Sequence, residues 1–83
     1  MPELSKLRWR CRRGIREMDL LLERFLEQCY PTLGAADRDA FDRLLDEADL
    51  DIYAWITGRE TPPDVRYRPL IHSLREIYAH HAD

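Results

Sequence analysis

The sequence predicts an all-α fold, a compact five-helix bundle that forms a single small domain over residues 1–83. Apolar residues recur at three- and four-residue steps over most of the chain, as expected of amphipathic helices. Turn-forming Gly and Pro residues separate these stretches, and the one strand-like alternation, at 65–67, is too short to count. A chain of this size buries only roughly 60–65% of its unfolded surface, so we expect a thin core with little room for a deep active-site cavity.

A single apolar stripe runs from Leu4 to Cys29 when each residue is advanced by about 100°. Ser5 lies near its start as a possible helix cap. Gly14 interrupts the stripe, and glycine costs about 1 kcal/mol relative to alanine inside a helix. Three neighbouring arginines also repel one another there. We therefore expect a break at Gly14, with helices over about 4–12 and 15–30.

The second half of the chain predicts three more helices. Apolar residues at four- and one-residue steps predict a helix over about 35–48. Asp49 is a candidate cap for a short helix over about 50–58, and Gly58 is its expected C-terminal stop. The last helix is expected to begin near 67–69, after an irregular turn at 63–66, because Pro69 is tolerated only in a first turn.

The formal net charge of −3 conceals a strong asymmetry along the chain. Residues 1–17 carry a net charge of +4, residues 18–60 carry −7, and residues 61–83 are neutral. A basic patch on an acidic body suggests nucleic acid, an acidic protein surface or anionic lipid as a partner. The pI near 5.6 counts against a dedicated nucleic-acid binder, which usually has a basic domain.

The usual signatures of catalysis, metal binding and membrane insertion are missing from the sequence. There is no Gly-rich phosphate loop, HExxH or CxxC motif, and neither serine lies in a nucleophile motif. Cys11 and Cys29 fall on the apolar stripe, which indicates buried inert thiols. No secretory signal or membrane-length apolar run is present. We expect a cytoplasmic, non-enzymatic protein without a catalytic residue, a metal or a cofactor of its own.

The run Trp9–Glu17 carries the functional signal. It contains one tryptophan, four arginines and one glycine, and ends in a glutamate. Helical phase places five of its residues opposite the apolar stripe: Trp9, Arg10, Arg13, Arg16 and Glu17. An exposed tryptophan among arginines is typical of an interface anchor, and Gly14 would let a partner backbone approach closely.

Arg13 and Glu17 are i,i+4 neighbours that can pair, but an exposed pair in this order contributes only a few tenths of a kcal/mol. The pattern alone therefore leaves open a binding surface and a solvated basic helix.

Two segments resemble a known family. Arg13-Gly14-Ile15-Arg16-Glu17 fits an RGxxE motif, and the wider run Trp9-x-Cys11-Arg12-Arg13-Gly14-x-Arg16-Glu17-x-Asp19 resembles the SdhE/YgfY family of small FAD assembly factors of succinate dehydrogenase. A second run, Asp49-x-Asp51-Ile52-Tyr53-x-Trp55-Ile56, is similar to the DxDLFxWL segment of that family. The resemblance covers about residues 5–78.

The resemblance implies a five-helix chaperone that assists covalent attachment of FAD to the flavoprotein subunit of succinate dehydrogenase, and in some members of fumarate reductase. The FAD would belong to this client, and we expect the chain to act as a monomer. Residue by residue, the resemblance makes Arg13, Gly14 and Glu17 the client-contacting motif. The residues expected to support it are Arg12, Arg16, Trp9 and Arg10. The alternative is a module that binds nucleic acid or an anionic surface through the same basic patch, and an antitoxin-like role ranks below both.

Overall fold

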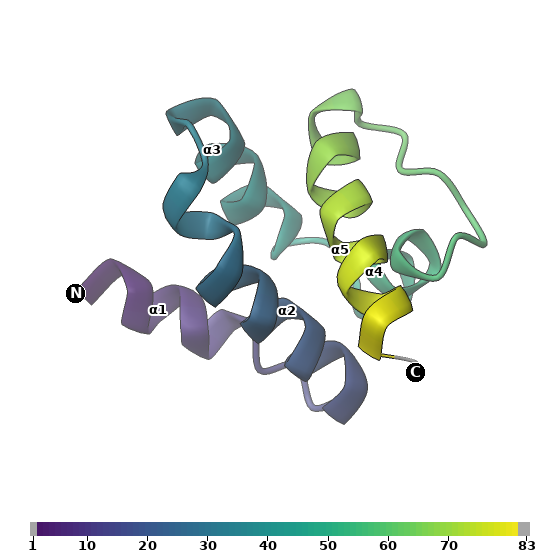
Figure 1. Ribbon diagram of the computed structural model, residues 1–83, viewed down its shortest axis with the longest axis horizontal. Helices are drawn as coiled ribbons and strands as arrows, with labels where there is room; N and C mark the ends of the chain where they lie inside the picture. Colours follow the sequence, from purple (N-terminus) through teal and green to yellow (C-terminus); the bar gives the residue numbers. More distant parts are fainter. Residues whose placement is uncertain (1, 82–83) are drawn as a thin grey trace.

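Five α-helices and two short 3-10 helices make up the regular structure of the described part of the chain (Figure 1). The computed structural model describes residues 2–81, so Met1, Ala82 and Asp83 of the predicted domain lie outside it. The helices are α1 (Pro2–Arg10), α2 (Arg16–Gln28), η1 (Tyr30–Thr32), α3 (Ala35–Leu44), α4 (Asp49–Ile56), η2 (Val65–Tyr67) and α5 (Arg68–His81). No strand occurs within residues 2–81, which confirms the predicted all-α class.

The core forms around α2, which crosses between α1 and α5 (Figure 1). Five residues of α2 are buried, and they join buried residues of the other four helices in one apolar cluster. Phe25 of α2 stacks on Phe41 of α3, with ring centroids 4.9 Å apart. Trp55 of α4 is buried and packs against Tyr67.

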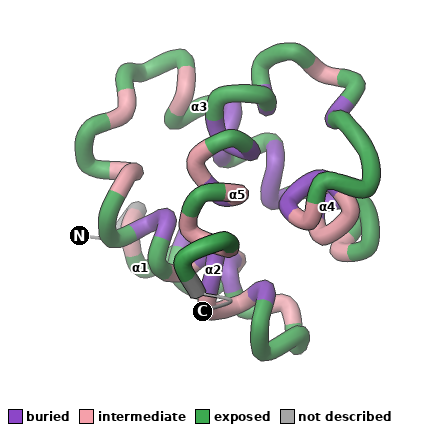
Figure 2. The backbone as a smooth tube through the Cα atoms, turned by 45° about the vertical axis from the view of Figure 1, so that its right-hand side comes forward, coloured by how far each residue is buried: buried purple, intermediate pink, exposed green. Residues whose placement is uncertain are grey.

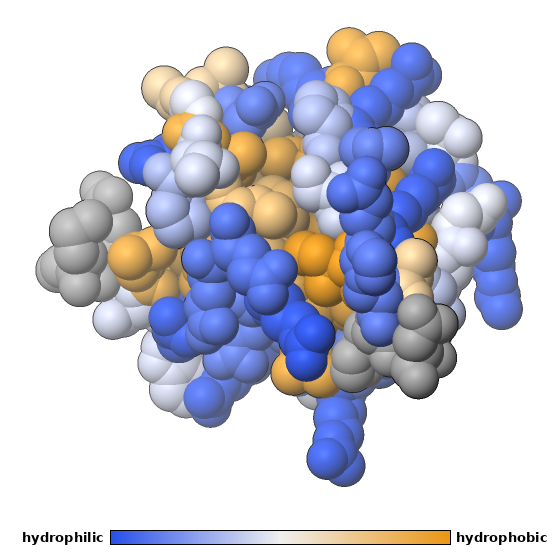
Figure 3. All heavy atoms as spheres, viewed as in Figure 1, coloured by the Kyte–Doolittle hydropathy of each residue, from blue (hydrophilic) through white to orange (hydrophobic). Residues whose placement is uncertain are grey.

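The outer surface is predominantly polar. Figure 2 shows buried segments around α2 and α4, while the connecting loops are mostly exposed. On the face seen in Figure 3, hydrophilic side chains lie over much of the surface, with small apolar areas between them. Within residues 2–81, no helix has the length and apolar composition needed to cross a membrane.

Both predicted glycine breaks are confirmed. Gly14 separates α1 from α2 with a φ of +88°, and Gly58 follows α4 with a φ of +83°. L-residues rarely adopt this left-handed region, whereas glycine enters it without steric cost. The third helix ends at Leu44 rather than near 48. The chain tightens there into i,i+3 bonds, with the amides of Asp46 and Glu47 donating to the carbonyls of Arg43 and Leu44 at 3.0 Å.

Two predicted helix caps are wrong. Ser5 lies inside α1, which begins at Pro2. Asp49 is the first residue of α4, where Ala48 occupies the N-cap position without a side-chain bond. The Asp49 carboxylate is instead engaged by Arg13. A side-chain cap does occur at η2, where Asp64 accepts from the amide of Arg66 at 2.9 Å.

Candidate docking surface around Gly14

The loop between α1 and α2 is held in shape by Gly14 and by Asp19. The Asp19 carboxylate accepts the amide of Arg13 at 2.7 Å and that of Gly14 at 3.2 Å. Ile15, at the N-cap position of α2, provides no side-chain bond. Asp19 therefore reaches back from α2 and fixes the backbone of the preceding loop, and its negative charge suits the N-terminal turn of α2.

Arg13 points into the molecule and not toward solvent. Its side chain is 14% exposed, and its Nε lies 2.6 Å from Oδ1 of Asp49. Its Nη2 donates to the carbonyl of Glu47 at 2.7 Å, and its Nη1 donates to the carbonyls of Leu45 and Arg10. We call this set of bonds the Arg13 bridge.

The predicted outward orientation of Arg13 and its predicted pairing with Glu17 therefore differ from the structure. Both rested on a helical phase that does not apply at this residue, because α1 ends at Arg10.

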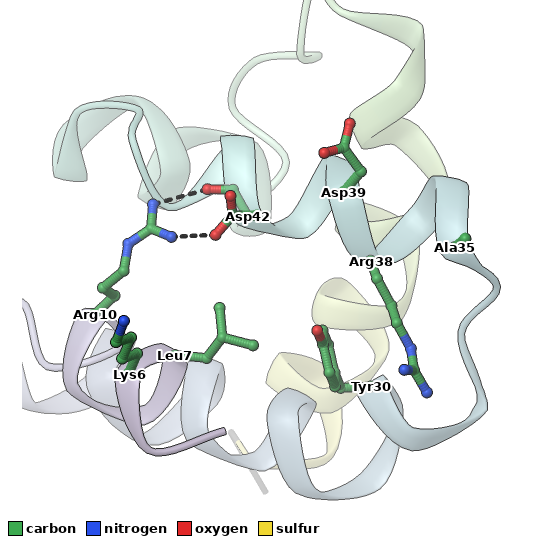
Figure 4. Close-up of a pocket in the computed structure, with 8 residues that line it drawn as sticks. All are labelled: Lys6, Leu7, Arg10, Tyr30, Ala35, Arg38, Asp39 and Asp42. Carbon is green, nitrogen blue, oxygen red and sulfur yellow. Dashed lines mark hydrogen bonds and ion pairs between the residues drawn. The ribbon is translucent and has the colours of Figure 1, made fainter. Parts of the chain in front are cut away.

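Two further arginines of the basic segment also bond within the chain. Arg10 reaches from α1 to α3, where it bonds the carboxylate of Asp42 and, at 2.8 Å, the Asp42 carbonyl (Figure 4). The same guanidinium lies 2.7 Å from Asp46. Arg8 pairs with Glu27 at 3.1 Å. The basic N-terminal segment is thus partly neutralised by the acidic body of the same molecule.

The other residues of the run face solvent. Trp9 is 71% exposed, and the Arg12 guanidinium lies over its ring, 5.3 Å from the centroid. Arg16 and Glu17 are exposed as well, and within the described residues Arg12, Arg16 and Glu17 form no ion pair. An open hollow of about 480 Å³ lies beside Gly14. We call the exposed set the Gly14 surface: Trp9, Arg12, Gly14, Arg16 and Glu17.

The two segments that carry the family resemblance meet in space. Their contact is the Arg13–Asp49 ion pair between the α1–α2 loop and α4. The charge of Glu17, followed by burial and by Tyr78, also raises the pKa of Tyr53 on α4. The sequence placed Asp19 and Asp49 within the two segments, but it did not identify them as the residues that hold the loop. The sequence feature that could have indicated this role is the opposite net charge of residues 1–17 and residues 18–60, which favours ion pairs between them.

Nothing in the described residues adds a metal site or a reactive thiol. No group of three or more metal-ligating side chains occurs among them. Burial raises the pKa of Cys11 to about 11, and it also raises that of the half-buried Cys29, so both thiols stay protonated at neutral pH. A hollow of about 510 Å³ between α1, η1 and α3 is lined by residues of both charge signs: Lys6, Leu7, Arg10, Tyr30, Ala35, Arg38, Asp39 and Asp42 (Figure 4).

Comparison with known proteins agrees with the resemblance. The family model described as "Flavinator of succinate dehydrogenase" matches residues 5–78. The chain is 38% identical over 73 residues to the FAD assembly factor SdhE of Coxiella burnetii, covering 88% of this chain and 89% of the relative. It is 42% identical over 77 residues to the FAD assembly factor SdhE of Xylella fastidiosa strain Temecula1, covering 93% and 79%. For that of Shewanella oneidensis the identity is 35% over 75 residues, covering 90% and 92%. No solved structure gives a significant match.

Proposed function

The chain belongs to the family of succinate dehydrogenase flavinators, and we propose that it promotes covalent attachment of FAD to the flavoprotein subunit of that enzyme by binding this subunit directly. The flavoprotein of fumarate reductase is a second client on the same reasoning. The FAD stays with the client, and this chain contributes a docking surface.

The observation that carries the proposal is the exposure of the Gly14 surface. Trp9 exposes 71% of its surface, although burying an indole is normally favourable. The Arg12 guanidinium is already stacked on this ring, so part of the side-chain ordering that binding requires has been achieved in the free protein. Arg16 lines the hollow beside Gly14 together with Arg12, and Glu17 is an exposed acid in the first turn of α2. Tryptophan and arginine are the residues that most often dominate binding energy at protein interfaces.

A chaperone mechanism fits this surface. The hollow beside Gly14 is shallow and open, and charged residues from the loop and α2 line it. The flavin chemistry is therefore assigned to the client. The chain acts by binding one client conformation more tightly than the others, which shifts the client population toward that conformation. The size of the effect is limited by the difference between the two affinities.

Nucleic-acid binding is disfavoured by the ion pairs of the basic segment. Arg8, Arg10 and Arg13 each lie within 4 Å of a carboxylate of this chain. Neutralised arginines release few counterions from a phosphate backbone, and counterion release supplies most of non-specific nucleic-acid affinity.

The test measures how well the Trp9→Ala and Glu17→Gln variants promote flavinylation of the purified client, with in-gel flavin fluorescence as the readout. Val65→Ala and Glu60→Gln are matched controls, because Val65 is 63% exposed and Glu60 is an exposed acid with no side-chain bond to a described residue. We expect Trp9→Ala to weaken client binding by about 30-fold or more, as for an interface hot spot. Wild-type flavinylation by both folded docking variants would contradict the proposal.

A further inference from the structure

One guanidinium joins the Gly14 loop to the junction of α3 and α4. We propose that Arg13 and Asp49 are positioning residues for client docking: their ion pair holds the loop in its binding shape, and the Arg13 side chain does not itself contact the client. This inference rests on the function proposed above and deepens it, because it assigns different roles to residues of one motif.

The bonds of Arg13 leave it little capacity for a partner. A guanidinium has five N–H donors in a fixed planar arrangement. In Arg13, four acceptors of this chain are within reach: the Asp49 carboxylate and the carbonyls of Leu45, Glu47 and Arg10. The side chain is 14% exposed. If a client carboxylate captured this guanidinium, these bonds would break and the carbonyls at the end of α3 would lose their donor.

The geometry also shows how the bridge controls the loop. The amides of Arg13 and Gly14 are fixed from one side by Asp19 on α2. The Arg13 side chain is fixed from the other side by Asp49, 36 residues away in the chain. The loop is therefore held at both its backbone and its side chain. Holding a loop in its bound shape before binding reduces the entropy lost on association, which raises affinity without adding a contact.

Asp49 can be tested separately from any general effect of negative charge on α4. Asp51 lies in the same first helical turn of α4, where the helix dipole stabilises a negative charge. Asp51 is exposed and forms no ion pair with the described residues. Asp51→Ala therefore removes the same charge from the same turn without breaking the Arg13 bridge, and it is the matched control for Asp49→Ala.

The experiment measures client affinity and amide hydrogen exchange at a temperature where circular dichroism shows each variant folded. The variants are Asp49→Ala, Asp51→Ala, Arg13→Ala and the Arg13→Ala/Asp49→Ala double. We expect Asp49→Ala to weaken client affinity about fivefold to tenfold and to speed exchange at Arg13 and Gly14 but not in α2 or α5. Asp51→Ala should change neither. The double variant should lose no more affinity than Arg13→Ala, since both changes remove one interaction.

The Asp49→Glu variant keeps a carboxylate near Arg13, so its client affinity should stay within about threefold of wild type. If Asp49→Ala is unfolded, Asp49→Asn takes its place in the experiment. A large loss in Arg13→Ala with no loss in Asp49→Ala would show that client docking does not depend on the Arg13–Asp49 ion pair, and would overturn the inference. Unchanged affinity in both, together with a loss in Glu17→Gln, would overturn it too while leaving the proposed function standing. If Glu17→Gln and Trp9→Ala also bind normally, the proposed function itself fails.

Discussion

Substituting Gly14 by alanine and by arginine separates what the backbone requires from what a partner requires. Gly14 has a φ of +88°, a conformation that costs a residue with a Cβ roughly 1–2 kcal/mol. Apart from its chain neighbours, no heavy atom lies within 4 Å of a Cβ built at this position. Alanine and arginine therefore incur the same backbone cost in the free protein, and neither encounters a steric clash at the Cβ.

The expected loss of stability is moderate and equal for the two variants. The strained φ is the main cost, and the net loss should be about 1 kcal/mol in the free energy of unfolding. For a domain of this size, that loss lowers Tm by about 4–8 °C. Helix content at 25 °C should not change. Asparagine tolerates the left-handed region better than alanine, so Gly14→Asn should melt between Gly14→Ala and wild type.

Client affinity should differ between Gly14→Ala and Gly14→Arg, although their stabilities should be the same. The arginine side chain of Gly14→Arg extends from the Gly14 surface into the space that a close partner would occupy. We expect Gly14→Arg to bind the client at least tenfold more weakly than Gly14→Ala, measured by calorimetric titration alongside thermal melts. Equal losses of affinity in both variants would show that the loop backbone, and not close approach, is what binding requires. Wild-type binding by Gly14→Arg would remove Gly14 from the interface altogether.

Alkaline pH should destabilise the fold through Cys11. Burial raises the pKa of this thiol from 9.0 to about 11, so between these pH values the folded protein retains a proton that the unfolded chain loses. Urea unfolding should therefore show a free energy that falls between pH 9 and pH 11, with a smaller fall in Cys11→Ala. Phe41→Ala removes a fully buried ring stacked on Phe25 and should cost about 3–5 kcal/mol, measured as a lower urea midpoint. Filter binding to single-stranded DNA should show only weak affinity with a shallow salt dependence, and a steep slope would revive the nucleic-acid alternative.

The helix breaks could be predicted from the sequence because they depend on local properties of the backbone. Gly58 directly follows the C-cap of α4, and Gly14 lies in the loop between α1 and α2. Both adopt a positive φ, which interrupts a right-handed helix whatever the surrounding fold. The end of the third helix could not be predicted in the same way. The apolar pattern continues through Leu45 and Ala48, but the carbonyls of Leu45 and Glu47 are taken by Arg13 of a distant loop. Apolar periodicity contains no information about such bonds.

Helical phase could not predict the direction of the Arg13 side chain for a related reason. Phase gives a direction only while the helix continues, and α1 ends before Arg13. The carboxylate partners of Arg10 and Arg13 lie 32 or more residues away, on α3, on α4 and in the turn between them. The family resemblance marked Arg13 as functional but did not say how it functions. The long-range ion pair to Asp49 supplies the physical basis for a positioning role.

The same ion pairs change what the charge asymmetry means. The net charge of +4 over residues 1–17 suggests a surface that attracts polyanions. Once carboxylates of this chain pair with Arg8, Arg10 and Arg13, much of that charge is no longer available to a partner. What remains exposed at the Gly14 surface is a stacked Trp9–Arg12 pair with one further charge of each sign. Such a surface selects partners by shape and by the arrangement of charges, which is the kind of recognition that one folded protein surface provides for another.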